Sequence, residues 1–72
     1  MIKFIRQYKF YGSDWFDIVY TDGKYITRIR TCLLQDLPKT AQKYIAEATH
    51  VREQEDTLHG HEIIYEVKES NR

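Results

Sequence analysis

Three histidines are the first residues whose type suggests chemistry, because imidazole nitrogens are common zinc ligands. His59 and His61 are two residues apart and would point the same way on a strand, and His50 could supply a third ligand. Their spacing matches no standard zinc signature, and Gly60 indicates a turn, where histidine is commonly exposed. We therefore predict neither a metal site nor a cofactor.

Covalent catalysis is the next chemistry to consider, since Cys32 is the one cysteine of the chain. A thiol nucleophile needs a neighbouring base, and no motif around Cys32 supplies one. The acidic run Glu53, Glu55 and Asp56 could form a carboxylate pair, but a charged run before a turn is typical of a solvated segment. The sequence also has no glycine-rich phosphate loop and no serine nucleophile elbow. We therefore predict that the protein is not an enzyme.

Aromatic and basic residues interleave along residues 9–30, and this pattern is the main functional signal of the sequence. Trp, Tyr and Arg are enriched at the energetic centres of protein–protein interfaces. The same side chains can stack on unpaired bases and hold phosphates, which is how proteins bind single-stranded nucleic acids. Either function requires that the fold gathers these residues on one face.

A β-hairpin is predicted to gather them. Residues 2–11, 15–21 and 24–31 are rich in β-branched and aromatic types, which favour strands. The dipeptide Asp22-Gly23 favours a two-residue turn between the second and third strands. One face of this hairpin is apolar and the other is polar, so its register is consistent on both faces. The predicted pairs are Phe16–Ile29, Ile18–Thr27 and Tyr20–Tyr25 on the apolar face, with Trp15–Arg30, Asp17–Arg28 and Val19–Ile26 on the opposite face.

The first strand is predicted to join the second through a three-residue loop, residues 12–14. This loop pairs Tyr8 with Ile18 on the apolar face and Lys9 with Asp17 on the opposite face. A two-residue loop would place Lys9 opposite Phe16 in the core, which is unfavourable. We call the sheet face that points away from the core the outer face. Its predicted members, which form the expected protein-binding surface, are Lys9, Tyr11, Trp15, Asp17, Val19, Ile26, Arg28 and Arg30.

A helix and a final strand complete the predicted fold. Apolar residues recur with helical spacing from Leu37 to Ala48, with Asp36 as N-cap and Pro38 in the first turn, and the helix ends near His50. Residues 61–68 predict a strand whose inward-facing residues are Ile63, Tyr65 and Val67. Residues 50–55 fit either a partner strand or an extension of the helix. We predict an α+β domain of order βββα(β)β, with one helix packed on a small, mostly antiparallel sheet.

Composition indicates one soluble domain spanning residues 1–72, with residues 69–72 as a frayed tail. No stretch approaches the ~20 apolar residues of a membrane helix, and residues 1–10 lack the apolar core of a signal peptide. We expect a cytoplasmic protein that does not contact membranes. The net charge is zero, but residues 1–30 carry six basic and three acidic residues, whereas residues 31–72 carry five basic and eight acidic ones. Such a chain could associate head to tail, and a homodimer would enlarge its small core.

The stretch from Asp36 to Lys68 resembles PepSY-type modules. A Leu-Pro pair precedes a helical segment with the sequence Ala-Gln-Lys-Tyr-Ile at residues 41–45, and Tyr-Glu-Val at residues 65–67 closes the module. The upstream hairpin also fits related periplasmic small-repeat proteins, so the resemblance covers residues 15–68. It implies a non-enzymatic, protein-binding or inhibitory module. Members of the family are usually exported or membrane-attached, unlike the cytoplasmic protein expected here.

We therefore expect a non-catalytic protein-binding module that acts as a small inhibitor or regulator of a larger protein. Chains of this size are typical of accessory proteins from phage or other mobile elements. Two alternatives use other partners: binding of single-stranded nucleic acid through the outer face, and self-association as a subunit of a larger complex. The zero net charge and the position of Asp17 among the bases favour a protein partner over nucleic acid.

Overall fold

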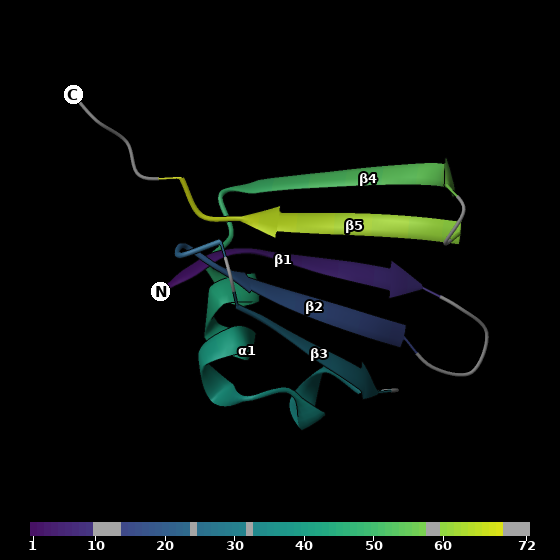
Figure 1. Cartoon of the computed structure of the whole chain (residues 1–72). Helices are drawn as coiled ribbons and strands as arrows, with labels where there is room; N and C mark the ends of the chain where they lie inside the picture. Colours follow the sequence, from purple (N-terminus) through teal and green to yellow (C-terminus); the bar gives the residue numbers. More distant parts are fainter. Residues whose placement is uncertain (10–13, 24, 32, 58–59, 69–72) are drawn as a thin grey trace.

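Five strands form one antiparallel sheet, and a single helix packs across one of its faces (Figure 1). The computed structural model describes residues 1–9, 14–23, 25–31, 33–57 and 60–68. The spatial order of the strands is β3-β2-β1-β5-β4, so the N-terminal strand lies at the centre of the sheet. The elements are β1 (Ile2–Lys9), β2 (Asp14–Tyr20), β3 (Ile26–Thr31), the 3₁₀ turn η1 (Leu34–Asp36), α1 (Lys39–Ala46), β4 (His50–Thr57) and β5 (Gly60–Glu66).

This architecture confirms the predicted α+β class, with the helix between β3 and β4. Residues 50–55, for which the sequence allowed either strand or helix, belong to β4. The predicted tail at residues 69–72 lies outside the described residues. In the part of the chain that the structure describes, neither helical segment has the length and apolar character needed to cross a bilayer.

The β2–β3 hairpin has the predicted register. Trp15 lies opposite Arg30 and Asp17 lies opposite Arg28, while the Tyr20 N–H donates to the Tyr25 carbonyl at 3.3 Å. The turn depends on Gly23, whose φ of 73° lies in the left-handed region that other residues adopt only with strain. The observed alignment of these two strands is therefore the one that the turn sequence favours.

The predicted register of β1 against β2 is wrong by three residues. Ile5, not Tyr8, lies opposite Ile18, and Gln7 lies opposite Phe16. An odd shift reverses the faces of a strand, because side chains alternate with a period of two. The observed register fully buries the aliphatic side chain of Ile5. Residues 10–13, which link β1 to β2 in the sequence, lie outside the described residues.

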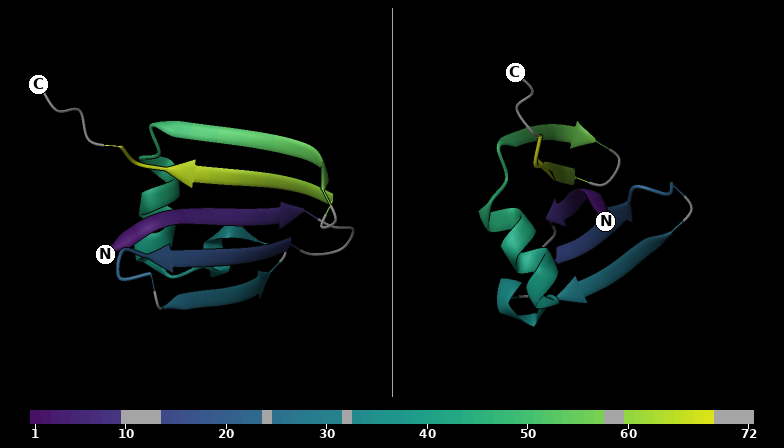
Figure 2. Two further views of the ribbon diagram at one scale, coloured as in Figure 1. Left: turned by 45° about the horizontal axis from the view of Figure 1, so that its top comes forward. Right: turned by 90° about the vertical axis from the view of Figure 1, so that its left-hand side faces the viewer.

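The core forms between α1 and the sheet. Its buried members are Ile5, Phe16 and Ile18 from the sheet, with Leu37 and Ala41 from the helical segment. Figure 2 shows that α1 covers the end of the sheet where β1 begins and that the opposite face of the sheet carries no helix. Two expectations about this helix are wrong: Pro38 rather than Asp36 occupies the N-cap position, and the helix ends at Ala46.

A specific hydrogen bond accounts for each correction. The Asp36 carboxylate accepts a hydrogen bond from the Thr31 hydroxyl at 3.0 Å, so it ties η1 to the end of β3 instead of capping α1. The Thr49 N–H donates to the Glu66 carbonyl at 3.0 Å, which directs the chain into β4 rather than into a further helical turn. Strand pairing with β5 thus decides where the helix ends.

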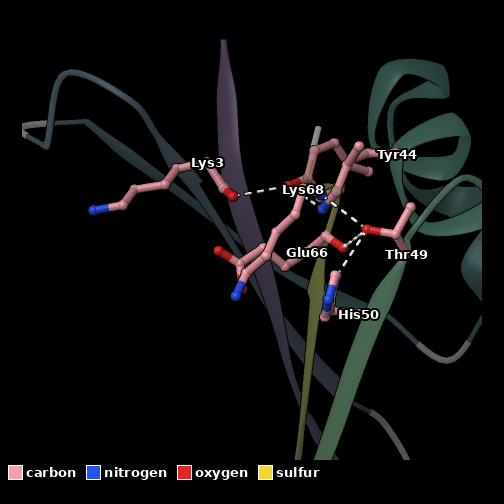
Figure 3. A network of polar contacts seen from close by, with 7 residues as sticks. Lys3, Tyr44, Thr49, His50, Glu66 and Lys68 are labelled. Carbon is pink, nitrogen blue, oxygen red and sulfur yellow. Dashed lines mark hydrogen bonds and ion pairs between the residues drawn. The ribbon is translucent and has the colours of Figure 1, made fainter. Parts of the chain in front are cut away.

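A polar network fastens α1 to the ends of the central strands (Figure 3). The Tyr44 hydroxyl donates to the Lys3 carbonyl at 2.8 Å and accepts from the Val67 N–H at 3.0 Å. The Thr49 hydroxyl accepts from the Lys68 N–H at 2.9 Å. Because β5 ends at Glu66, Val67 lies beyond the strand and not within it, contrary to the sequence prediction.

Candidate functional site

The outer face of the sheet is the surface that the sequence singled out. Phe16 and Ile18 are buried against the helix, so the alternating β2 residues Trp15, Asp17 and Val19 project from the opposite face. Their cross-strand partners on β3 project with them. The outer face therefore contains all the predicted members from β2 and β3, namely Trp15, Asp17, Val19, Ile26, Arg28 and Arg30.

Of the two predicted members from the first strand, Lys9 is not brought to this surface. Lys9 pairs with Asp14 and shares the face of Gln7, which is the helix-bearing face. Tyr11 lies outside the described residues. The β1 residues on this face are instead Arg6 and Tyr8, which lie opposite Asp17 and Trp15.

A signal for this exchange was present in the sequence. The predicted register would have placed Arg6 on the core face together with Tyr8 and Phe10. A buried arginine without an acidic partner is costly, so this conflict favours a register of the opposite parity. The observed register removes the conflict by moving Arg6 to the outer face.

Asp17 is a buried carboxylate on a face that no helix covers. Asp17 is only 2% exposed. Arg28 donates to it twice, from Nε to Oδ1 at 2.7 Å and from Nη2 to Oδ2 at 3.1 Å. These hydrogen bonds, followed by the negative charge of Asp17, raise the pKa of Arg28. The Arg28 side chain is nevertheless 62% exposed. A guanidinium has five N–H donors, and two of them bind Asp17, so Arg28 is held in one orientation while most of its side chain stays exposed.

Arg30 packs against an aromatic ring. Its guanidinium carbon lies 5.6 Å from the centre of the Trp15 ring, within cation–π range. Ile26, at the other end of β3, is exposed on the same face. We call Trp15, Ile26, Arg28 and Arg30 the β3 strip. It combines an aromatic ring, an aliphatic side chain and two oriented guanidinium groups.

The β1–β5 half of the outer face is different, because its charges are compensated within the face. The Arg6 guanidinium lies 5.4 Å from the Phe4 ring and 5.8 Å from the Tyr8 ring, and its Nη1 donates to the Tyr8 hydroxyl at 2.9 Å. Arg6 Nε also lies 3.2 Å from Glu62 Oε2. Both side chains of this ion pair are at least two-thirds buried. The charged groups in this half of the face bind one another across the sheet. They are therefore less suited to contact a partner than the side chains of the β3 strip.

A second polar cluster lies on the helix-bearing face, in the part of the sheet that α1 does not cover. The Tyr65 hydroxyl donates to Gln7 Oε1 at 2.7 Å, and Gln7 Nε2 donates to Asp14 Oδ2 at 2.6 Å. Burial, followed by the charges of Glu53 and Asp14, raises the pKa of Tyr65. His61 Nε2 lies 3.4 Å from Glu53 Oε1. The polar atoms of the Tyr65–Gln7–Asp14 chain are bound to one another, which is the arrangement of a structural network.

The described residues contain no group of three or more His, Cys, Asp or Glu side chains that could hold a metal ion. Cys32 and His59, which the sequence analysis weighed as nucleophile and ligand, lie outside the described residues.

Comparisons with known proteins give no family for this chain. The resemblance of residues 15–68 to PepSY-type modules therefore stays a prediction. A scan of protein-family models, a search of curated proteins and a search of solved structures each found no match.

Proposed function

We propose that this chain is a non-catalytic protein-binding module that regulates or inhibits a larger protein through the β3 strip. The observation that carries the proposal is the fixation of two exposed arginines, Arg28 by the buried Asp17 carboxylate and Arg30 by the Trp15 ring. Side chains that are already ordered lose less conformational entropy when a partner binds. Trp and Arg are also the residue types that dominate binding energy at protein interfaces.

A protein partner fits these charges better than nucleic acid does. Asp17 compensates Arg28, Glu62 compensates Arg6, and the chain as a whole has no net charge. Non-specific nucleic-acid binding draws its free energy from several cationic contacts to phosphate. On the helix-bearing face, the polar groups of Tyr65, Gln7 and Asp14 hydrogen-bond one another. This structural role of the cluster agrees with a protein that binds without catalysing a reaction. The module would act by covering a functional surface of its partner.

The test compares protein capture by the wild type with capture by two arginine variants. Immobilised wild-type protein, Arg30→Ala and Arg52→Ala would be incubated with nuclease-treated lysate of the source organism, and the retained proteins identified. Arg52 is a matched control because it is an exposed arginine on β4, at the far edge of the same sheet. The proposal predicts one protein that the wild type and Arg52→Ala retain and Arg30→Ala loses.

A fluorescence titration addresses the alternative partner. Trp15 is the sole tryptophan of the chain, so its emission reports directly on the β3 strip. Single-stranded and duplex oligonucleotides would be titrated at about 50 mM and about 200 mM salt, because phosphate-driven binding weakens steeply between these concentrations. Saturable quenching that fades at the higher salt would replace the proposed function with nucleic-acid binding. Equal capture by all three proteins would also overturn the proposal.

A further inference from the structure

The two edges of the sheet differ in chemistry. β3 and β4 are the outermost strands (Figure 2). Four large apolar side chains at β3 and its flanks are at least half exposed: Tyr25, Ile26, Leu33 and Leu34. On β4, only Val51 is comparable among the described side chains, and it is followed by the charged residues Arg52, Glu53 and Glu55. Charged edge strands resist the addition of a further strand, whereas apolar edges favour it.

We infer that the free edge of β3 binds an extended segment of the partner protein as a sixth strand of the sheet. This inference rests on the proposed function and specifies the chemistry of the partner. Within the described residues, β3 pairs with β2 alone. An edge strand presents a row of backbone N–H and C=O groups on its unpaired side, and these groups can bind an added strand.

The side chains of β3 define which segment fits. Side chains of a strand alternate between the two faces, so an added strand would place every second residue beside Arg28 and Arg30 on the outer face. Acidic residues at these positions would be attracted by the positive charges of the two guanidinium groups. The intervening residues would lie beside Ile29 on the helix-bearing face, close to the chain that continues to the exposed Leu33 and Leu34. The segment therefore alternates acidic and apolar residues over roughly six positions, or about 20 Å.

The same charges disfavour a symmetric dimer through this edge. Two copies of β3 paired antiparallel about Ile29 would bring Arg28 of each copy opposite Arg30 of the other on one face. Like charges directly opposite each other destabilise a strand pair. An acidic segment of another protein avoids this repulsion.

The experiment uses three short peptides, each carrying a fluorescein label. The first alternates Glu and Val over eight residues, the second alternates Lys and Val, and the third repeats the first with N-methyl groups on alternate backbone amides. N-methylation removes the donors that a strand needs but keeps every side chain. Binding would be measured by fluorescence anisotropy with the full chain and with the variants Arg30→Glu and Arg52→Glu.

Strand addition predicts saturable binding of the Glu–Val peptide to the wild type and to Arg52→Glu. Arg30→Glu should weaken this binding on the order of tenfold and strengthen binding of the Lys–Val peptide, because it turns a cross-strand attraction into a repulsion. Circular dichroism spectra that match the wild type would show that each variant is folded. The N-methylated peptide should bind much more weakly than its parent. Backbone amide chemical shifts of the wild type should change mainly at β3.

Three results would overturn the inference. Equal binding of the parent and N-methylated peptides would mean that side chains alone make the contact. No binding of the Glu–Val peptide, together with Arg30-dependent capture of a protein from lysate, would leave the proposed function intact and remove strand addition. Concentration-dependent self-association in sedimentation experiments, abolished by Arg30→Glu, would identify a second copy of this chain as the occupant of the edge.

Discussion

Replacement of Gln7 by alanine tests the polar chain that joins the central strand to both of its neighbours. Gln7 is 7% exposed and binds Asp14 of β2 at 2.6 Å and Tyr65 of β5 at 2.7 Å. Each hydrogen bond contributes about 0.5–1.5 kcal/mol net, and a buried methylene contributes about 0.8 kcal/mol. Gln7→Ala should therefore lower the free energy of unfolding by about 2–4 kcal/mol. A domain of 72 residues has about 4–11 kcal/mol in total, so this loss is large.

Urea unfolding followed by Trp15 fluorescence and by circular dichroism measures this change. With a slope of about 1 kcal/mol/M, the midpoint should fall by about 2 M or more. Gln54→Ala is the matched control, because Gln54 is an exposed glutamine in β4, and its effect should stay within about 0.5 kcal/mol. A similar midpoint for the two variants would refute the assigned role of Gln7.

A second variant separates the hydrogen bonds from the loss of volume. Gln7→Leu keeps most of the buried volume but gives the Tyr65 hydroxyl no acceptor and Asp14 no amide donor. It should remain less stable than the wild type by about 1–3 kcal/mol, the cost of buried polar groups without partners. Wild-type stability in Gln7→Leu would show that packing alone explains the alanine result.

Two further predictions concern Tyr65 and Gly23. The pKa of the Tyr65 hydroxyl is raised in the folded protein. As pH rises, the unfolded chain therefore loses the Tyr65 proton before the folded protein does. The contribution of Tyr65 to stability is fully present below about pH 10 and is lost as pH rises above it. When the pH is raised from 8 to 10.5, the free energy of unfolding measured with urea should therefore fall less for Tyr65→Phe than for the wild type. An equal fall in both proteins would contradict the raised pKa of Tyr65. Gly23 has φ 73° and open space where a Cβ would lie, so Gly23→Ala should cost about 1–2 kcal/mol through backbone strain alone. Gly23→Asn, which tolerates this conformation better, should cost less, and equal midpoints for both variants would argue against strain.

The parts of the fold that the sequence predicted correctly are those with local causes. Asp22-Gly23 and the polar–apolar alternation of its flanking strands determine the β2–β3 register, and the structure has that register. The β1–β2 connection has no comparable turn signal. Its register depends on a non-local contact, the burial of Ile5 against Phe16 and Ile18. The length assumed for the connection between the first two strands could not, by itself, predict that contact.

β4 shows the same limit. Residues 50–57 contain Val51 as their only aliphatic residue and otherwise carry charged or polar side chains. The spacing of apolar residues therefore predicts neither a helix nor a strand in this segment. The strand forms because β5 offers it a ladder of backbone partners, with Val51 opposite Tyr65 and Arg52 opposite Ile64. Tertiary pairing thus overrides weak intrinsic preference.

These two limits bear directly on the candidate site. The β3 strip depends only on the hairpin, which is why its residues could be predicted together. The β1 contribution depends on the shifted register, which removes Lys9 from the outer face and brings Arg6 into contact with Tyr8 and close to Glu62. In the predicted register, Lys9 would lie on the outer face and would not take part in the ion pair that Arg6 makes with Glu62. Its charge would extend the basic surface toward the centre of the sheet, which would favour nucleic-acid binding. Because Arg6 is instead compensated within the face, the oriented arginines concentrate on β3, a strand at the edge of the sheet.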